Sequence, residues 1–237
     1  MLADDPQLTV NQLSAGLSVS QVSIRNYLNS LAEKGFLTRI HGGAVTTFHP
    51  GILERTQTQT EVKGRIARAA ADLVSDGDTI MVEAGTTTAL IVRYLLGKRD
   101  ITIVTNNTLV LAYTRGNPGI HLTVTGGEFR PATESLVGPL TLEDLMKFHV
   151  KTAFVGTDGF SPALGLTTHI VEGAEVVRAM ASHAQQTVAV ADSTKFGRAG
   201  FVHVLPLHSI DILVTDTGLP EAAVAEITET GIDVRCV

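Results

Sequence analysis

The stretch with the clearest chemical character is Gly85-Thr86-Thr87-Thr88, which follows the apolar run Thr79–Val82 and precedes an apolar-periodic segment. A strand that ends in a small, hydroxyl-rich turn before a helix presents free backbone N–H groups and the positive end of the helix dipole, and this combination suits a phosphate. The stretch therefore predicts the phosphate end of a small-ligand pocket. One alternative stays open, namely that Gly85 only permits a tight turn and one threonine caps the helix.

Four later segments have the same character, each at the end of an expected strand. They are Thr105-Asn106-Asn107, Gly126-Gly127-Glu128, Gly156-Thr157-Asp158-Gly159 and Asp192-Ser193-Thr194-Lys195. Parallel sheets bind ligands at the carboxyl ends of their strands, so glycines, hydroxyls, amides, carboxylates and a lysine at one edge predict a site for a polyhydroxy, phosphorylated ligand. Turn propensity explains each segment separately, but it explains less well why all five share one edge.

The elements that would position these segments alternate between helix and buried strand from Glu61 onward. The expected strands are Thr79–Val82, Ile101–Thr105, His121–Thr125, Thr152–Val155, Val188–Ala191, Ile210–Thr215 and Ile232–Cys236. The expected helices are Val62–Val74, Thr88–Leu96, Leu109–Tyr113, Leu140–Phe148, Gly173–Ala184 and Pro220–Glu229. Short apolar strands separated by helices predict an α/β domain with a mainly parallel, Rossmann-like sheet covered on both faces.

The head of the chain predicts two helices joined by a turn. Thr9 is the expected N-cap of Val10–Ala15, which Gly16 closes, and Ser20 is the expected N-cap of a helix from Gln21 to about Lys34, which Gly35 closes. In the second helix the spacing of Ile24, Leu28 and Leu31 predicts that they face inward.

The outward positions at the start of the second helix carry side chains that bond base edges and phosphates. They are Ser20, Gln21, Ser23, Arg25 and Asn26. Donors at the N-terminal end of a second helix are typical of a helix-turn-helix that reads the major groove. An ordinary helical hairpin is the alternative that spacing alone leaves open.

Residues 36–45 predict a small β-wing, because two apolar segments surround a basic centre and a Gly-Gly turn. Its candidate DNA contacts are Arg39, His41 and Gly42. The polar segment 47–60 lacks sustained periodicity and contains Pro50-Gly51, so it predicts a linker. The expected domains are therefore 1–46, the linker 47–60 and 61–237.

Composition limits the classes of function. The 237 residues are 44% hydrophobic and 18% charged, as is ordinary for a soluble globular protein with a full core. The one cysteine, Cys236, and the lack of a basic-then-apolar leader at Met1 favour the cytoplasm. No apolar run approaches the ~20 residues that a membrane helix needs. The eight histidines stand singly, so no metal or other cofactor is expected.

The net charge of −6 is unevenly distributed. Residues 1–46 carry Arg25, Lys34 and Arg39 against Asp4, Asp5 and Glu33. The head is therefore neutral and the remainder acidic, which places any DNA contact in the head.

The segment VSQVSIRNYLNSLAEKGFLTRIHGGAV, from Val19 to Val45, closely resembles the DNA-binding domain of the DeoR family of bacterial transcriptional regulators. The resemblance implies a recognition helix and a wing that bind double-stranded operator DNA. Two features depart from the family. Asn26-Tyr27-Leu28 stands where the family has Arg-Asp-Leu, and only Met1–Pro6 precede Gln7 where the family has a further helix of about a dozen residues. Either the sequence as given starts late, or that helix is missing and the head is poorly packed.

The later segments AGTTT, VTNN, TGGxxR, AFVGTDGF, GLTT and ADSTKFG follow in the order of the same family's sensor half. That half is similar to the ribose-5-phosphate isomerase fold used for binding a sugar phosphate. The resemblance implies effector-binding positions among the strand-end residues. These are Gly85, Thr86, Thr87, Thr88, Thr105, Asn106, Asn107, Gly126, Asp158, Gly159 and Lys195. Val177 stands where the family commonly has a lysine, so the effector can differ.

Catalysis is not expected. The isomerase carries Asp-Gly-Ala-Asp where this chain has Val155-Gly156-Thr157-Asp158, and Thr167-Thr168-His169 stands where its lysine lies. Isomerisation needs a carboxylate base and groups that stabilise the enediolate, and of these only Asp158 is kept. The enzyme alternative would require an altered chemistry that uses Asp158 and Glu172.

The sequence thus predicts a DNA-binding regulator, a repressor of a carbohydrate-catabolic operon that a sugar phosphate releases from DNA. Two half-sites imply a homo-oligomer, a dimer or tetramer. The alternatives are a sugar-phosphate isomerase-like enzyme with a vestigial head, and a sensor that no longer binds DNA.

Overall fold

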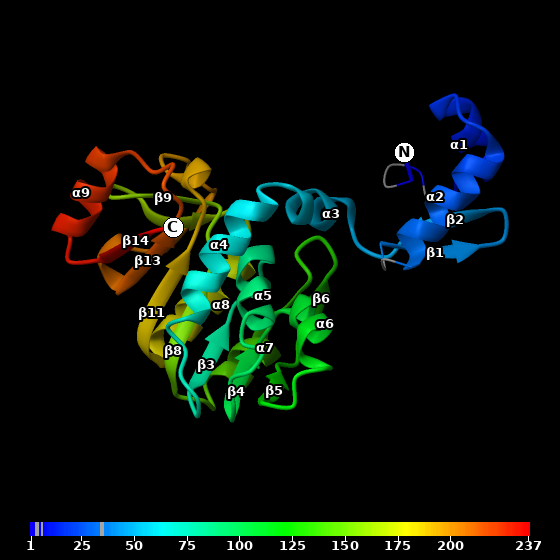
Figure 1. Ribbon diagram of the computed structural model, residues 1–237. Coiled ribbons are helices and arrows are strands. Elements are labelled where there is room, and N and C mark those ends of the chain that lie inside the picture. The colour runs from blue at the N-terminus through cyan, green and yellow to red at the C-terminus, as the bar shows by residue number, and fades with distance from the viewer. Residues whose placement is uncertain (3–4, 6, 34–35) are drawn as a thin grey trace. The chain divides into compact units, whose positions relative to one another are not determined.

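The structure is a computed structural model that describes residues 1–2, 5, 7–33 and 36–237 (Figure 1). By its internal contacts the chain divides into two compact units, Met1–Thr58 and Gln59–Val237. Each is described by itself.

The first unit begins with helix α1 (Val10–Leu17), whose N-cap is Thr9 as expected. The Thr9 hydroxyl accepts from the Gln12 N–H, and the Thr9 N–H donates to Gln12 Oε1 at 2.8 Å, which completes a capping box. The prediction that Gly16 closes this helix is wrong. The helix continues to Leu17, and Ser18 takes the left-handed conformation at φ 55°.

Helix α2 (Gln21–Glu33) follows, and Ser20 Oγ accepts from the Ser23 N–H at 3.1 Å, as an N-cap does. Ile24 and Leu28 are buried as predicted, but Leu31 is 39% exposed, so the inward stripe ends a turn early. The predicted helix end at Lys34 and the closing Gly35 lie outside the described residues.

The predicted wing is present. Strands β1 (Leu37–Ile40) and β2 (Gly43–Thr46) pair antiparallel around His41-Gly42, where Gly42 takes φ 80°. Thr9 bridges to Gly43 beside them. The core of this unit is formed by Val10, Leu13, Ile24, Leu28, Leu37 and Ala44.

The segment predicted to be a linker contains a helix, α3 (Pro50–Gln57). Pro50 occupies its first turn and His49 Nδ1 accepts from the Gly51 N–H at 3.1 Å. Ile52 is only 1% exposed. The only large apolar residues of α3, Ile52 and Leu53, are adjacent, so the sequence shows no helical periodicity here.

The second unit is built on a sheet of seven parallel strands in the order β14-β13-β11-β8-β3-β4-β5. The strands are β3 (Thr79–Val82), β4 (Ile101–Thr105), β5 (Ile120–Val124), β8 (Val150–Val155), β11 (Ala184–Val190), β13 (Ile212–Thr215) and β14 (Asp233–Cys236). All seven expected strands are present; β3 and β4 have the predicted boundaries, and those of the other five are shifted by a few residues. The predicted Rossmann-like α/β fold is confirmed.

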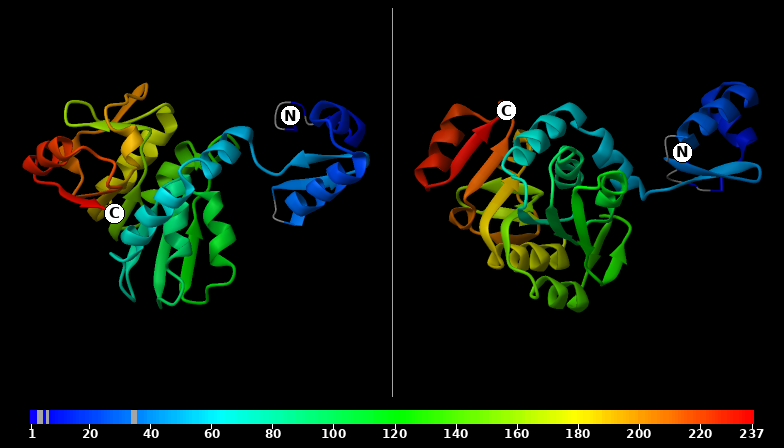
Figure 2. Two further views of the ribbon diagram at one scale, coloured as in Figure 1. Left: turned by 45° about the horizontal axis from the view of Figure 1, so that its top comes forward. Right: turned by 60° about the horizontal axis from the view of Figure 1, so that its bottom comes forward.

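Helices cover both faces of this sheet (Figure 2). One face packs against α4 (Thr60–Ala71), α5 (Thr86–Arg93) and the η1–α6 segment (Thr108–Val110 and Leu111–Thr114). The other packs against α7 (Pro139–Leu145), α8 (Val171–Ser182) and α9 (Glu221–Glu229). Side chains alternate in direction along each strand. In β3, Ile80 and Val82 therefore pack on the face covered by α4 and α5, and Met81 packs on the face covered by α7 and α8.

Antiparallel elements that the sequence pattern did not predict are added to this frame. Strands β6 (Glu128–Arg130) and β7 (Ser135–Val137) form a hairpin after β5. Strands β9 (Gly159–Ser161), β10 (Gly165–Thr168) and β12 (Val202–Leu205) form a small sheet in the order β12-β10-β9. The short helices η2 (Ser193–Lys195) and η3 (Leu207–Ser209) complete the unit.

Candidate effector site and DNA-binding head

The order of the parallel strands creates a switch point between β3 and β8. From β3 the chain proceeds through β4 to β5 on one side, and it then returns to β8, β11, β13 and β14 on the other. In open α/β sheets the crevice at the carboxyl ends of two such strands is where ligands bind. The loops after β3 and β8 hold Gly85–Thr88 and Gly156–Gly159, so two of the predicted segments flank the switch point.

Helix α5 begins earlier than predicted, at Thr86, and its N-cap is Gly85. A glycine has no side chain to cap the helix, so the alternative in which a threonine caps it is wrong. Thr86 is partly exposed, Thr87 is 8% exposed and Thr88 is buried, with its hydroxyl donating to the Gly85 carbonyl at 3.0 Å. Because the N–H groups of a first helical turn lack intrahelical acceptors, this turn is suited to an anion.

The predicted polar residues after β4 lie at the same edge, but their side chains bond the backbone. Asn107 Nδ2 donates to the carbonyls of Glu83 and Gly85 at 3.1 and 3.0 Å. Asn106 Oδ1 accepts from the Ala84 N–H at 2.9 Å, and Thr105 Oγ1 donates to Val82. Thr105 at the end of β4 and the two asparagines after it are each at most 1% exposed. They hold the turn before α5 in place, and ligand contact by these side chains stays a prediction.

The glycines after β5 are also engaged. The Gly126 N–H donates to Asp144 Oδ2 at 2.8 Å, and its carbonyl accepts from Thr141 Oγ1 at 2.7 Å. Gly127 adopts φ 133°, and a Cβ there would come within 2.7 Å of the Val137 carbonyl oxygen. This segment therefore fits the start of β6 closely against α7.

The residues after β8 and β11 meet near the switch point. Asp158 Oδ2 accepts from Thr168 Oγ1 at 2.8 Å and from the His169 N–H at 3.1 Å. The Lys195 ammonium on η2 donates to the Thr157 carbonyl, which places a cation beside the loop after β8. Gly159 lies within β9, where a Cβ would come within 2.2 Å of the Arg198 carbonyl oxygen, so its role is close packing.

The sequence did not predict the burial of Glu83 and Lys63. Glu83, 9% exposed, follows β3, and its Oε2 accepts from the Gly156 N–H at 3.0 Å, which ties the two strands of the switch point together. Lys63 on α4 is 6% exposed. Lys63 stands three and four residues before the buried Ile66 and Ala67, so helical spacing in the sequence places it on the inward face of α4.

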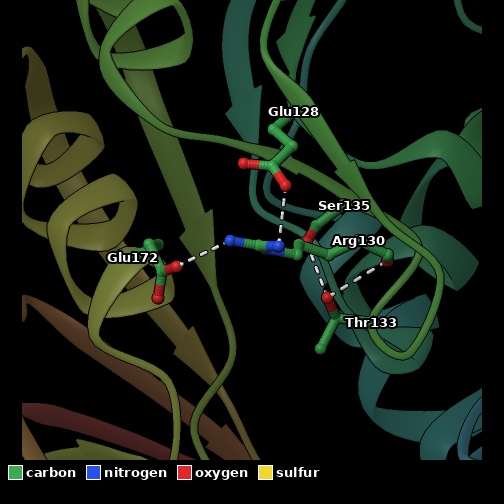
Figure 3. Close-up of polar contacts among 5 residues, drawn as sticks. All are labelled: Glu128, Arg130, Thr133, Ser135 and Glu172. Carbon is green, nitrogen blue, oxygen red and sulfur yellow. Dashed lines mark hydrogen bonds and ion pairs between the residues drawn. The ribbon is translucent and has the colours of Figure 1, made fainter.

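A guanidinium between two carboxylates was also missed (Figure 3). Arg130 Nη1 donates to Glu128 Oε1 at 2.8 Å, and its Nη2 donates to Glu172 Oε1 at 3.0 Å on the first turn of α8. The pKa of Glu172 is lowered, first by its own backbone N–H and then by the bond from Arg130. The TGGxxR segment contains Arg130, but no sequence signal pairs it with Glu172.

The end of β13 supports η2. Asp216, 7% exposed, accepts from the Ser193 N–H and hydroxyl at 2.6 and 2.8 Å and from the Gly218 N–H at 2.9 Å. Burial acts to raise the pKa of Asp216, but these hydrogen bonds outweigh it, so the pKa is lowered. Cys236 on β14 is exposed as a residue, but partial burial of its sulfur raises the pKa of the thiol, and the Asp216 charge raises it further.

In the head, the predicted DNA contacts fall into two groups. Ser20, Gln21, Arg25 and Asn26 are exposed at the start of α2, and Ser23 is partly exposed, with its hydroxyl 2.9 Å from that of Ser20. His41 and Gly42 are exposed at the tip of the wing.

Arg39 differs from the other predicted contacts because it is partly buried against α2. Its Nη1 donates to Asn29 Oδ1 at 2.9 Å, and its Nε is a buried donor without a partner among the described residues. In this structure Arg39 fixes the wing to the recognition helix. Its contact with DNA stays a prediction.

The part of the chain that the structure describes holds no group of three or more His, Cys, Asp or Glu side chains placed to ligate a metal ion. Within the same ranges, every helix is too short or too polar to cross a bilayer.

Comparison with known proteins agrees with this architecture. Residues 1–47 match the DeoR-like helix-turn-helix domain, and residues 58–217 match the DeoR C terminal sensor domain. The HTH-type transcriptional repressor GlcR of Bacillus subtilis is 32% identical, over 94% of this chain and 87% of the relative. The glycerol-3-phosphate regulon repressor of Escherichia coli is 29% identical, over 96% and 92% respectively.

Among solved structures, ribose 5-phosphate isomerase A from Methanocaldococcus jannaschii is similar at a TM-score of 0.42 and 19% identity, over 59% of this chain and 55% of that one. The family expected from the sequence motifs is confirmed by the two domain matches, which follow each other in the order of the two structural units. The chain belongs to the DeoR family of helix-turn-helix transcriptional regulators.

Proposed function

We propose that this protein is a DNA-binding repressor of a carbohydrate-catabolic operon and that a phosphorylated sugar, bound in its second unit, releases it from the operator. The observation that carries the proposal is the helix start at the switch point. There α5 begins shortly after β3 with Gly85 as its N-cap, and Glu83 in the same turn accepts from the Gly156 N–H after β8. That geometry suits a phosphate, and the hydroxyls and Lys195 nearby suit a sugar.

The names of the relatives support this reading. One is named a repressor, and another is named the repressor of a regulon for a phosphorylated three-carbon compound. We infer from them the sign of regulation, repression, and the class of effector, an organic phosphate.

The effector acts by differential binding. It releases the operator only if it binds the arrangement that is incompetent for DNA more tightly than the competent one, and the change in operator affinity cannot exceed that difference. A homo-oligomer, a dimer or tetramer, would place two heads on two half-sites. Since the head carries no net charge, avidity supplies affinity that a basic head would otherwise gain from phosphates.

We further propose that the sugar phosphate is bound without turnover in the cytoplasm. Val155 stands where the isomerase fold needs a catalytic carboxylate, and Asp158 is engaged by Thr168 and by the His169 N–H. A coupled assay on pentose and hexose phosphates tests this point. Product formation would favour the enzyme alternative.

The deciding experiment is fluorescence anisotropy of the full chain on DNA from upstream of its own gene and of the neighbouring operon. Titrations are made with and without a panel of sugar phosphates. Sequence-preferring binding that one compound releases is the expected result. If a sugar phosphate raises the melting temperature but no DNA is bound, the chain is a sensor alone and the repressor proposal is wrong.

A further inference from the structure

Arg130 joins two elements that are far apart in the sequence. It ends β6, and its guanidinium bonds Glu128 in the same strand and Glu172 on α8 (Figure 3). The Arg130 side chain is 42% exposed and that of Glu172 is 36% exposed, so solvent and a small ligand can reach the pair. An arginine that presents a planar fork to carboxylates presents the same fork to a phosphate.

The β6–β7 hairpin that carries Arg130 is also bonded to the turn before α5. Asn106 Nδ2 donates to the Leu136 carbonyl at 3.0 Å, and the Leu136 N–H donates to the Asn106 carbonyl at 2.8 Å. Through its Oδ1 the same asparagine accepts from the Ala84 N–H. Asn106 therefore connects the element that holds Arg130 to the turn proposed for the phosphate.

Little free energy is lost when Arg130 exchanges its carboxylate partner for a phosphate. A half-exposed ion pair is weakened by water and salt, whereas a guanidinium bound to a phosphate makes charge-assisted bonds to a dianion. Glu172 keeps part of its stabilisation when Arg130 leaves, because its own backbone N–H at the start of α8 is the largest contribution to its lowered pKa. Glu128 is 67% exposed and is hydrated without Arg130.

We infer that Arg130 is a specificity-determining residue of the effector site: it leaves Glu172 to bind the phosphoryl group of the effector, so that Glu172 competes with the ligand for the same guanidinium. The inference rests on the proposed function, because it deepens the recognition of the sugar phosphate. It assigns opposite effects to the two members of one ion pair. Arg130 favours ligand binding and Glu172 opposes it.

The test is isothermal titration of the full chain with ribose 5-phosphate, glucose 6-phosphate, glycerol 3-phosphate and inorganic phosphate. Arg130→Gln should weaken binding of the phosphates that the parent chain binds by about tenfold or more, as expected for loss of a charge-assisted bond. Glu172→Gln should tighten binding several-fold. Arg235→Gln is the matched control, because Arg235 is also 42% exposed and pairs with one carboxylate, Asp233, at 2.9 Å. It should leave binding unchanged.

The direction of the Glu172→Gln effect shows whether Glu172 competes with the ligand for Arg130 or whether the ion pair only stabilises the structure, as a brace would. If both substitutions weaken binding, the ion pair is a brace and the inference is wrong. If the parent chain binds a phosphate and Arg130→Gln binds it equally well, the inference fails alone, whereas binding of none of the probes overturns the proposed function as well. Arg130→Lys, which keeps the charge without the fork, should lie between the parent and Arg130→Gln. Circular dichroism melts show whether each variant is folded.

Discussion

At the scale of single residues, the two units use side chains differently. Helix α2 leaves its donors exposed, whereas the amides and hydroxyls after β3 and β4 mostly bond the backbone. Ligand recognition in the second unit therefore depends on fewer groups than the sequence suggested. The helix start at Thr86–Thr88 and the cations Lys195 and Arg130 are the ones we expect to matter most.

Arg25→Ala should weaken operator binding about tenfold or more, because an exposed arginine at the start of a recognition helix is suited to a guanine edge or a phosphate. The stabilisation given by the effector should be unchanged. Anisotropy measures the first effect and thermal melts measure the second. Arg99→Ala, which removes an 82% exposed arginine of the second unit, serves as the control. Unchanged operator affinity for Arg25→Ala would show that α2 is not the recognition helix.

Thr87→Val and Lys195→Ala should make operator binding insensitive to the effector. The first replaces a buried hydroxyl on the first turn of α5 by a methyl group of similar size, and the second removes the cation on η2. Operator affinity without effector should be retained in both variants. A normal effector response in both, measured by anisotropy, would contradict the site assignment.

At the scale of elements, the sequence predicted what depends on local pattern. The inner parallel strands were recognisable because they are mostly buried apolar runs, as in Ile101–Thr105, whereas the edge strands β5 and β14 are more exposed. Strand β6 escaped prediction because Glu128–Arg130 is three residues long with two of them exposed, so it has no apolar signal. The Arg130–Glu172 pair was equally unpredictable, since it joins residues 42 positions apart that meet only after the sheet has formed.

The link between β13 and η2 predicts a pH dependence. The pKa of Asp216 is lowered in the folded protein, so the stability that it contributes is complete above the unfolded value of about 4 and is lost as the pH falls through the lower folded value. Asp216→Asn should lower the free energy of unfolding at pH 7 by about 1–3 kcal/mol and flatten its decline in acid. Urea unfolding between neutral and acidic pH measures both. An unchanged acid profile would exclude this carboxylate as a source of the decline.

At the scale of the whole molecule, the proposed function requires that the two compact units communicate and that more than one chain assembles on the operator. A DNA duplex with two half-sites should bind about 10²-fold or more tightly than one with a single half-site, because the second contact becomes intramolecular. Because the head is neutral, we expect the salt dependence per head to be shallow. Equal affinity for both duplexes, in anisotropy titrations at several salt concentrations, would indicate that the chain binds as a monomer.

The single cysteine, Cys236, gives the protein a natural chemical probe of effector binding. Cys236 pairs in register with Thr215, next to the carboxylate that holds η2, and its raised pKa keeps the thiol protonated and slow to alkylate at neutral pH. An effector that rearranges the loops after β11 and β13 would alter the field of Asp216 on the sulfur. The alkylation rate of Cys236 would then change when the effector binds. Effector binding could therefore be followed in the unmodified protein without an introduced label.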